Sequence, residues 1–181
     1  MEPGSIAERF RDRSILITGS TGFLAKMLVE KILRIQPDVR KLYLLVRAPD
    51  AAAAKERLLT EVVGKGLFDV LREQHGASFH SFIKEKVCPL PGDITHQNFG
   101  LGNSEILRLS QDVDIIVNGA ATTNFMESPI TSRCSFMFPL LGEEKRLQIS
   151  LTACCSVETR SGVGVCLACF GGYSAERTDC T

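Results

Sequence analysis

Short runs of apolar residues alternate with amphipathic stretches along the first two thirds of the chain. Runs that are apolar throughout are typical of strands buried on both faces of a parallel sheet. We expect four such strands, at 14–18, 42–46, 87–90 and 113–117. Between them, apolar residues recur at helical spacing. This predicts helices between Gly22 and Pro37 and at 51–63, 67–73, 79–86 and 104–110. Strands that alternate with helices predict an α/β fold with a parallel sheet.

The pattern changes at Ser128. Residues 147–152 alternate like a half-exposed strand, but no amphipathic helix is recognisable beyond this point. Six of the seven cysteines follow it, and Cys166 and Cys169 have the spacing of a metal or redox pair. The tail has no histidine and no second pair at zinc-ribbon spacing, so we expect no metal site and favour an aberrant C-terminus. We therefore expect an ordered unit at 1–127 and an irregular, cysteine-rich tail at 128–181 that is not an independent domain.

Composition adds few constraints. The formal net charge is zero, so neither nucleic acid nor an anionic membrane is favoured as the main partner. No stretch approaches the ~18 uninterrupted apolar residues of a transmembrane segment. Residues 1–13 are charged and lack the apolar core of a secretory signal. We expect a protein of the cytosol or of a cytosol-facing surface.

Small residues separate the first expected strand from the first expected helix, in the spacing Gly19-x-x-Gly22-x-x-Ala25. This is a variant of the dinucleotide-binding fingerprint. Gly19 permits a tight turn, Gly22 lets backbone N–H groups approach a pyrophosphate, and Ala25 allows close packing of helix on sheet. The N–H groups and the helix dipole then favour a bound anion. A glycine-rich turn without a ligand is the alternative.

The end of the second strand predicts which dinucleotide is bound. An acidic residue there would accept hydrogen bonds from the ribose 2′-hydroxyl of NAD. Here the strand ends in Val46 and Arg47, and Arg57 follows one helix later. A guanidinium suits a 2′-phosphate, so the sequence favours NADP(H) over NAD. The alternative is that Arg47 is simply a solvated strand end.

Two further strand ends contribute candidates. Asp93 follows the third strand, where it could accept a hydrogen bond from an adenine amino group, although a Gly-Asp turn is equally consistent. Asn118 ends the fourth strand and precedes Gly119, Ala120 and Ala121. These small residues would let the nicotinamide half of a coenzyme lie against the backbone, and a simple strand-to-helix turn is the alternative.

Four motifs stand in order within residues 5–127: TGSTGFLA at 18–25, LYLLVR at 42–47, GDI at 92–94 and NGAATTNF at 118–125. Together they resemble the alcohol-forming fatty acyl-CoA reductases, most closely the plant branch related to the male-sterility and wax or suberin enzymes. These are extended short-chain dehydrogenases. The resemblance implies a Rossmann-type, doubly wound parallel sheet and an NADPH-dependent oxidoreductase. Such an enzyme reduces a long-chain acyl-CoA to an aldehyde and then to a primary alcohol.

The resemblance also implies a role for each matching residue. The pyrophosphate would lie on Gly19, Ser20, Thr21, Gly22 and Phe23, the 2′-phosphate on Arg47 and Arg57, the adenine beside Asp93 and Ile94, and the nicotinamide half beside Gly119, Ala120 and Ala121. The implied substrate is a long-chain acyl-CoA. Family members act at the cytosolic face of the endoplasmic reticulum or in plastids.

The catalytic Tyr-x-x-x-Lys of that family has no counterpart here. Only Tyr43 and Tyr173 are present, and neither is followed four residues later by lysine. Because the resemblance stops near Glu127, we expect a form truncated after about four strands. A non-catalytic NADP-binding module, or a partner of a full-length reductase, is the alternative. With the order 3-2-1-4, the fourth strand would lack its usual neighbour, so we expect marginal stability.

Overall fold

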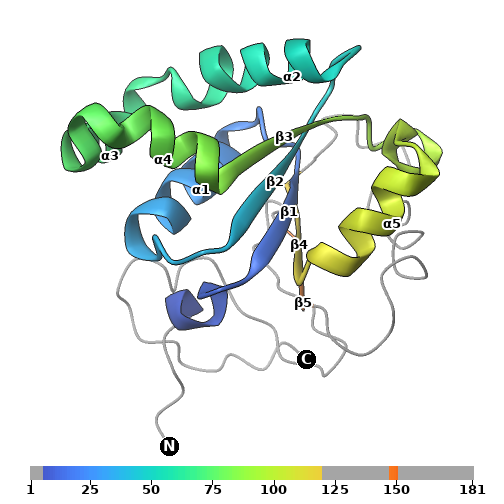
Figure 1. Cartoon of the computed structure of the whole chain (residues 1–181), viewed down its shortest axis with the longest axis horizontal. Coiled ribbons are helices and arrows are strands. Elements are labelled where there is room, and N and C mark those ends of the chain that lie inside the picture. The colour runs from blue at the N-terminus through green and yellow to red at the C-terminus, as the bar shows by residue number, and fades with distance from the viewer. Residues whose placement is uncertain (1–5, 120–146, 151–181) are drawn as a thin grey trace, which may run out of the picture.

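A parallel sheet forms the centre of the molecule (Figure 1). The structure is a computed structural model of the 181-residue chain and describes residues 6–119 together with the strand at 147–150. The strands are β1 (Ser14–Thr18), β2 (Lys41–Val46), β3 (Val87–Pro91), β4 (Ile115–Asn118) and β5 (Leu147–Ser150). They are hydrogen-bonded in the order β3-β2-β1-β4-β5, and every neighbouring pair is parallel. The four expected strands and the order 3-2-1-4 are therefore confirmed.

The outer edge of β4 differs from the expectation. We expected this strand to lack a neighbour, but β5 pairs with it in parallel, with Ile115 opposite Leu147 and Asn118 opposite Ser150. The alternating pattern at 147–152 indicated a strand without indicating its place. Because β4 is paired on both sides, the expected reason for marginal stability does not hold. The domain boundary at 127 remains a prediction, although β5 lies beyond it in the same sheet.

Helices connect the strands and follow the expected ranges closely. The α-helices are α1 (Phe23–Ile35), α2 (Ala51–Arg57), α3 (Asp69–His75), α4 (Phe79–Lys86) and α5 (Asn103–Asp112). Short helical segments lie at η1 (Ile6–Phe10), η2 (Leu58–Val63), η3 (Gly66–Phe68), η4 (Gly76–Ser78) and η5 (Gln97–Gly100). Asp50 caps α2 as expected, since its carboxylate accepts a hydrogen bond from the Ala53 amide at 2.8 Å. The helix then continues as the π-helical η2 before Gly64 ends it.

The two faces of the sheet carry separate cores. Strand residues alternate between them, so that Ile15 and Ile17 belong to one core and Leu16 to the other. The first core packs against α1, α2, α3 and α4, and the second packs against α5. Helices on both faces make this a doubly wound sheet of the Rossmann type, as expected. Within the described residues, no helix is both long enough and apolar enough to cross a membrane.

Candidate nucleotide-binding site

The carboxyl ends of β1, β2, β3 and β4 meet at one edge of the sheet, and hydrogen bonds join neighbouring ends there. The Gly119 amide donates to the carbonyl oxygen of Thr18 at 3.1 Å, which joins the ends of β4 and β1. The Gly92 amide donates to the carbonyl oxygen of Val46 at 3.0 Å, which joins the ends of β3 and β2. In open α/β sheets, ligands bind outside these ends, where the strand order reverses. Here that point lies between β1 and β4.

The loop between β1 and α1 has the geometry that its glycines suggested. Gly19 has a φ of +63°, which lies in the left-handed region that favours glycine. The Gly22 amide donates to the carbonyl oxygen of Gly19 at 2.8 Å, and a Cβ added to Gly22 would lie only 3.0 Å from that oxygen. Gly22 is the N-cap of α1 and supplies no side-chain cap. Gly22 therefore leaves the first amide N–H groups of α1 without a side-chain acceptor. Such N–H groups at the start of a helix can bind an anion.

The side chains of this loop differ in direction. Ser20 is fully buried, and its hydroxyl donates to the carbonyl oxygen of Leu45 at 2.6 Å, which ties the loop to β2. The Ser20 hydroxyl is therefore not available to a ligand. Thr21 is half-buried, whereas Phe23 is 73% exposed at the start of α1. The loop thus presents backbone and an aromatic ring at the edge of the sheet.

Arg47 begins the segment after β2, and its side chain is 68% exposed. Its Nε lies 3.1 Å from Oδ2 of Asp93, which follows β3. The other carboxylate oxygen of Asp93 accepts hydrogen bonds from the Thr95 amide at 2.8 Å and hydroxyl at 2.9 Å. Burial raises the pKa of Asp93, but the Thr95 hydrogen bonds and the Arg47 charge outweigh it and lower the pKa below its ordinary value. Asp93 is thus an ionised partner of Arg47.

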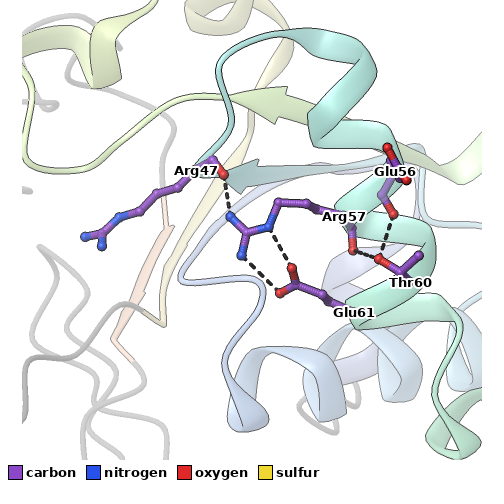
Figure 2. A network of polar contacts seen from close by, with 5 residues as sticks. All are labelled: Arg47, Glu56, Arg57, Thr60 and Glu61. Atoms are coloured by element: carbon purple, nitrogen blue, oxygen red, sulfur yellow. Dashed lines mark hydrogen bonds and ion pairs between the residues drawn. The ribbon is translucent and has the colours of Figure 1, made fainter.

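The guanidinium of Arg57 is engaged within the protein (Figure 2). Its Nε and one terminal nitrogen donate to the two carboxylate oxygens of Glu61, at 2.7 Å and 3.0 Å. Its other terminal nitrogen donates to the backbone carbonyl oxygen of Arg47, while the Arg47 side chain extends away from it (Figure 2). The hydrogen bond with Glu61 raises the pKa of Arg57, and the same bond lowers that of Glu61. Sequence reasoning missed Glu61, although its spacing of four residues from Arg57 is that of a helical ion pair.

At the end of β4, sequence reasoning also missed a buried polar contact. The Thr18 hydroxyl donates to the side-chain oxygen of Asn118 at 2.7 Å, and both residues are buried. A polar residue closing each of two apolar strands is the signal that could have found it. Gly119 follows directly, but Ala120 and Ala121 lie outside the described residues. Near β3, Ile94 is partly buried and packs against the second core.

Tyr43 lies within β2 and is 6% exposed, as expected. Its hydroxyl hydrogen-bonds to Oδ2 of Asp112 at 3.2 Å. Burial and the Asp112 carboxylate raise the pKa of Tyr43 to about 12. Cys166 and Cys169 lie outside the described residues, within which no group of three or more candidate metal ligands is found.

Two solved structures that this chain resembles are reductase domains. The reductase (R) domain of a nonribosomal peptide synthetase from Mycobacterium tuberculosis matches with a TM-score of 0.59 and 27% identity, over 82% of this chain and 34% of that one. The terminal R domain of the myxalamid PKS-NRPS pathway matches with a TM-score of 0.58 and 25% identity, over 77% of this chain and 34% of that one. The fold and the loop between β1 and α1 thus define a Rossmann-type domain of the kind found in reductases. Membership of this class is evidence for binding of a nicotinamide coenzyme.

Sequence comparison identifies the family. Residues 17–134 match the model of the male sterility protein family, and the chain belongs to that family. It is 50% identical over 127 residues to an alcohol-forming fatty acyl-CoA reductase of Simmondsia chinensis, which covers 70% of this chain and 26% of the relative. It is 54% identical over 119 residues to a probable fatty acyl-CoA reductase of Arabidopsis thaliana, covering 65% of this chain and 24% of the relative. The expected resemblance is confirmed, and the chain spans about a quarter of these relatives' length.

Proposed function

We propose that this chain binds NADP(H) at the carboxyl edge of its sheet and supplies the coenzyme-binding part of a fatty acyl-CoA reductase. The proposal rests above all on Arg47, an exposed guanidinium at the end of β2, where an NAD-specific domain would have an acidic residue. A 2′-phosphate is a dianion that such a group can bind through charge-assisted hydrogen bonds.

The remaining contacts follow the strand ends. The amides of Gly19 to Phe23 would bind the pyrophosphate, since they open α1 and Gly22 leaves the approach free of a Cβ. Arg47 would face the 2′-phosphate, with Arg57 beside it and bound to the Arg47 carbonyl oxygen, and Asp93 and Ile94 would border the adenine. Gly119, Ala120 and Ala121 would flank the nicotinamide half. When bound, the coenzyme supplies hydride.

The names of the relatives support the substrate. They are fatty acyl-CoA reductases from plants, so we propose a long-chain acyl-CoA as the substrate and a primary alcohol as the product of the whole enzyme. A relative of Arabidopsis thaliana that is 50% identical over 115 residues is described as chloroplastic, which supports a plastid as one location. The cytosolic face of the endoplasmic reticulum is the other proposed location.

The sequence contains no Tyr-x-x-x-Lys motif to donate the proton. Tyr43 is buried, its hydroxyl is bound to Asp112, and its pKa is about 12, so it is a poor general acid. Tyr173 is followed four residues later by Arg177 rather than lysine. This favours a second candidate function, a non-catalytic NADP-binding module that acts with a full-length reductase. Formation of fatty alcohol from NADPH and long-chain acyl-CoA by the 181-residue chain alone would exclude it.

Coenzyme titration tests the main proposal. We expect the chain to bind NADPH more tightly than NADH, and Arg47→Glu to weaken NADPH binding by about 10- to 100-fold while NADH binding changes little. The matched control is Arg40→Glu, because Arg40 is exposed just before the opposite end of β2. Equal affinities for the two coenzymes in the unmodified chain would refute NADP(H) selectivity, as would an unchanged preference in Arg47→Glu.

A further inference from the structure

The side chain of Arg57 joins two parts of the chain that are ten residues apart in sequence (Figure 2). A guanidinium has five N–H donors in a fixed plane. Two of them are directed at the carboxylate of Glu61, and a third at the backbone carbonyl oxygen of Arg47. Arg57 therefore hydrogen-bonds to the main chain of Arg47, whereas the side chain of Arg47 extends away from α2 (Figure 2).

The hydrogen bond from Arg57 to the Arg47 carbonyl oxygen fixes the short segment between β2 and α2. Arg47 directly follows the last residue of β2, and α2 begins at Ala51. At the far end of the segment, Asp50 is held by its hydrogen bond with the Ala53 amide. At the near end, the backbone is held by Arg57. The direction in which the Arg47 side chain leaves the strand thus depends on the Arg57 guanidinium, which holds its backbone, as well as on the ion pair with Asp93.

Glu61 in turn fixes Arg57. A two-pronged contact between a carboxylate and a guanidinium sets the plane of the guanidinium as well as its position. Both side chains are 39% exposed, and ion pairs at such positions contribute little to stability, typically about 0–1 kcal/mol. The pair is therefore poorly explained as a stabilising contact. Its specific result is an oriented N–H donor directed at the Arg47 carbonyl oxygen.

We propose that Glu61 is a positioning residue for coenzyme selection, which holds Arg57 on the Arg47 backbone so that the Arg47 guanidinium meets the 2′-phosphate. The inference rests on the proposed binding of NADP(H). It makes a prediction opposite in sign to simple electrostatics. Removal of a negative charge near a phosphate site should tighten phosphate binding if charge alone decides. If Glu61 positions Arg47, the same removal weakens it.

The test compares Glu61→Gln with Glu56→Gln in the 181-residue chain, with NADPH and NADH titrated separately. Glu56 lies one turn earlier and is exposed, and its contact in the network is made by its backbone carbonyl oxygen, which accepts from the Thr60 hydroxyl at 2.9 Å (Figure 2). Both variants lose one negative charge, but only Glu61→Gln loses the two-pronged contact. We expect Glu61→Gln to weaken NADPH binding by about three- to tenfold, with NADH binding unchanged and Glu56→Gln equal to the unmodified chain.

A second variant, Arg57→Lys, keeps the charge but removes the planar fork. We expect it to lose the same preference for NADPH, and the double variant with Glu61→Gln to be no worse than either single one, because both act through one unit. Unchanged or tighter NADPH binding in Glu61→Gln would overturn the inference, as would full preference in Arg57→Lys. If the unmodified chain shows no preference for NADPH, the proposed function itself fails, which is a different result.

Discussion

Gly22 and Gly102 offer a matched test of the nucleotide-binding loop. Both are N-caps without a side-chain cap, of α1 and α5 respectively, and their backbone angles are nearly the same: φ −74° and ψ 159° against φ −67° and ψ 154°. These angles are allowed for any residue, so alanine adds no backbone strain at either position. The two sites differ in space. A Cβ on Gly22 would lie 3.0 Å from the Gly19 carbonyl oxygen, whereas one on Gly102 meets nothing within 4 Å.

The magnitude follows from that difference. At both positions, alanine reduces the entropy of the unfolded chain but is a poorer N-cap than glycine, and the two effects oppose each other. We therefore expect Gly102→Ala to change the free energy of unfolding by less than about 0.5 kcal/mol. Gly22→Ala adds crowding against a backbone atom, for which overpacking costs about 1–3 kcal/mol. It also displaces the start of α1, and losing one phosphate hydrogen bond would weaken NADPH binding by about tenfold.

Urea unfolding followed by circular dichroism measures the first effect, and titration of NADPH fluorescence measures the second. Gly22→Ala and Gly102→Ala should therefore differ in both assays. Equal free energies of unfolding would show that the loop relaxes around the added methyl group. Unchanged NADPH affinity in Gly22→Ala would refute the placement of the pyrophosphate on this loop.

Two further predictions concern buried hydroxyl groups. Ser20→Ala leaves the Leu45 carbonyl oxygen without its 2.6 Å partner, so we expect the free energy of unfolding to fall by about 1–3 kcal/mol; a loss below measurement error in urea unfolding would contradict this. The pKa of Tyr43 rises from 10.0 to about 12 on folding, because burial and Asp112 favour the neutral phenol. Its contribution to stability is therefore complete below pH 10 and falls between pH 10 and about 12, by up to roughly 2–3 kcal/mol. Unfolding measured across this range should lose that pH dependence in Tyr43→Phe, and parallel curves for the two chains would show that Tyr43 is not responsible.

Much of the fold was predictable because burial on both faces leaves a simple pattern. The strand at β2 reads as continuous apolar residues since every residue after Lys41 is buried. The helix α1 shows apolar spacing because one face packs on the sheet. Its limits were predictable from Gly22 and Pro37, whose backbone preferences depend little on tertiary contacts.

Other features depend on tertiary context and had no local signal. Asn98 and Phe99 adopt positive φ angles of 53° and 59° in η5; asparagine enters this region readily, but nothing in the sequence indicates it for Phe99. The π-helical turn of η2 is likewise unmarked in the sequence. The pairing of β5 with β4 joins residues about thirty positions apart, across a segment whose pattern predicts no helix.

The candidate site was predictable in its positions but less so in its contacts. Gly19 and Arg47 lie where the strand ends indicated, because the carboxyl ends of parallel strands share one edge. The direction of each side chain depends on neighbours that are distant in sequence. Thus Ser20 points inward to Leu45, and Arg57 is held by Glu61. For the same reason, the ion pair between Arg47 and Asp93 could not be foreseen from their separate strand ends.

The contact between Arg47 and Asp93 links the proposed binding of the 2′-phosphate to the proposed binding of the adenine. The Arg47 guanidinium has Oδ2 of Asp93 3.1 Å from its Nε. An incoming anion would compete with that carboxylate for the guanidinium, and a dianionic phosphate would compete more strongly than a neutral ribose hydroxyl. If the phosphate displaced it, Oδ2 of Asp93 would become available as an acceptor at the position proposed for the adenine amino group. Binding of the phosphate by Arg47 and binding of the adenine by Asp93 would then be coupled. A coenzyme without the phosphate would make neither contact.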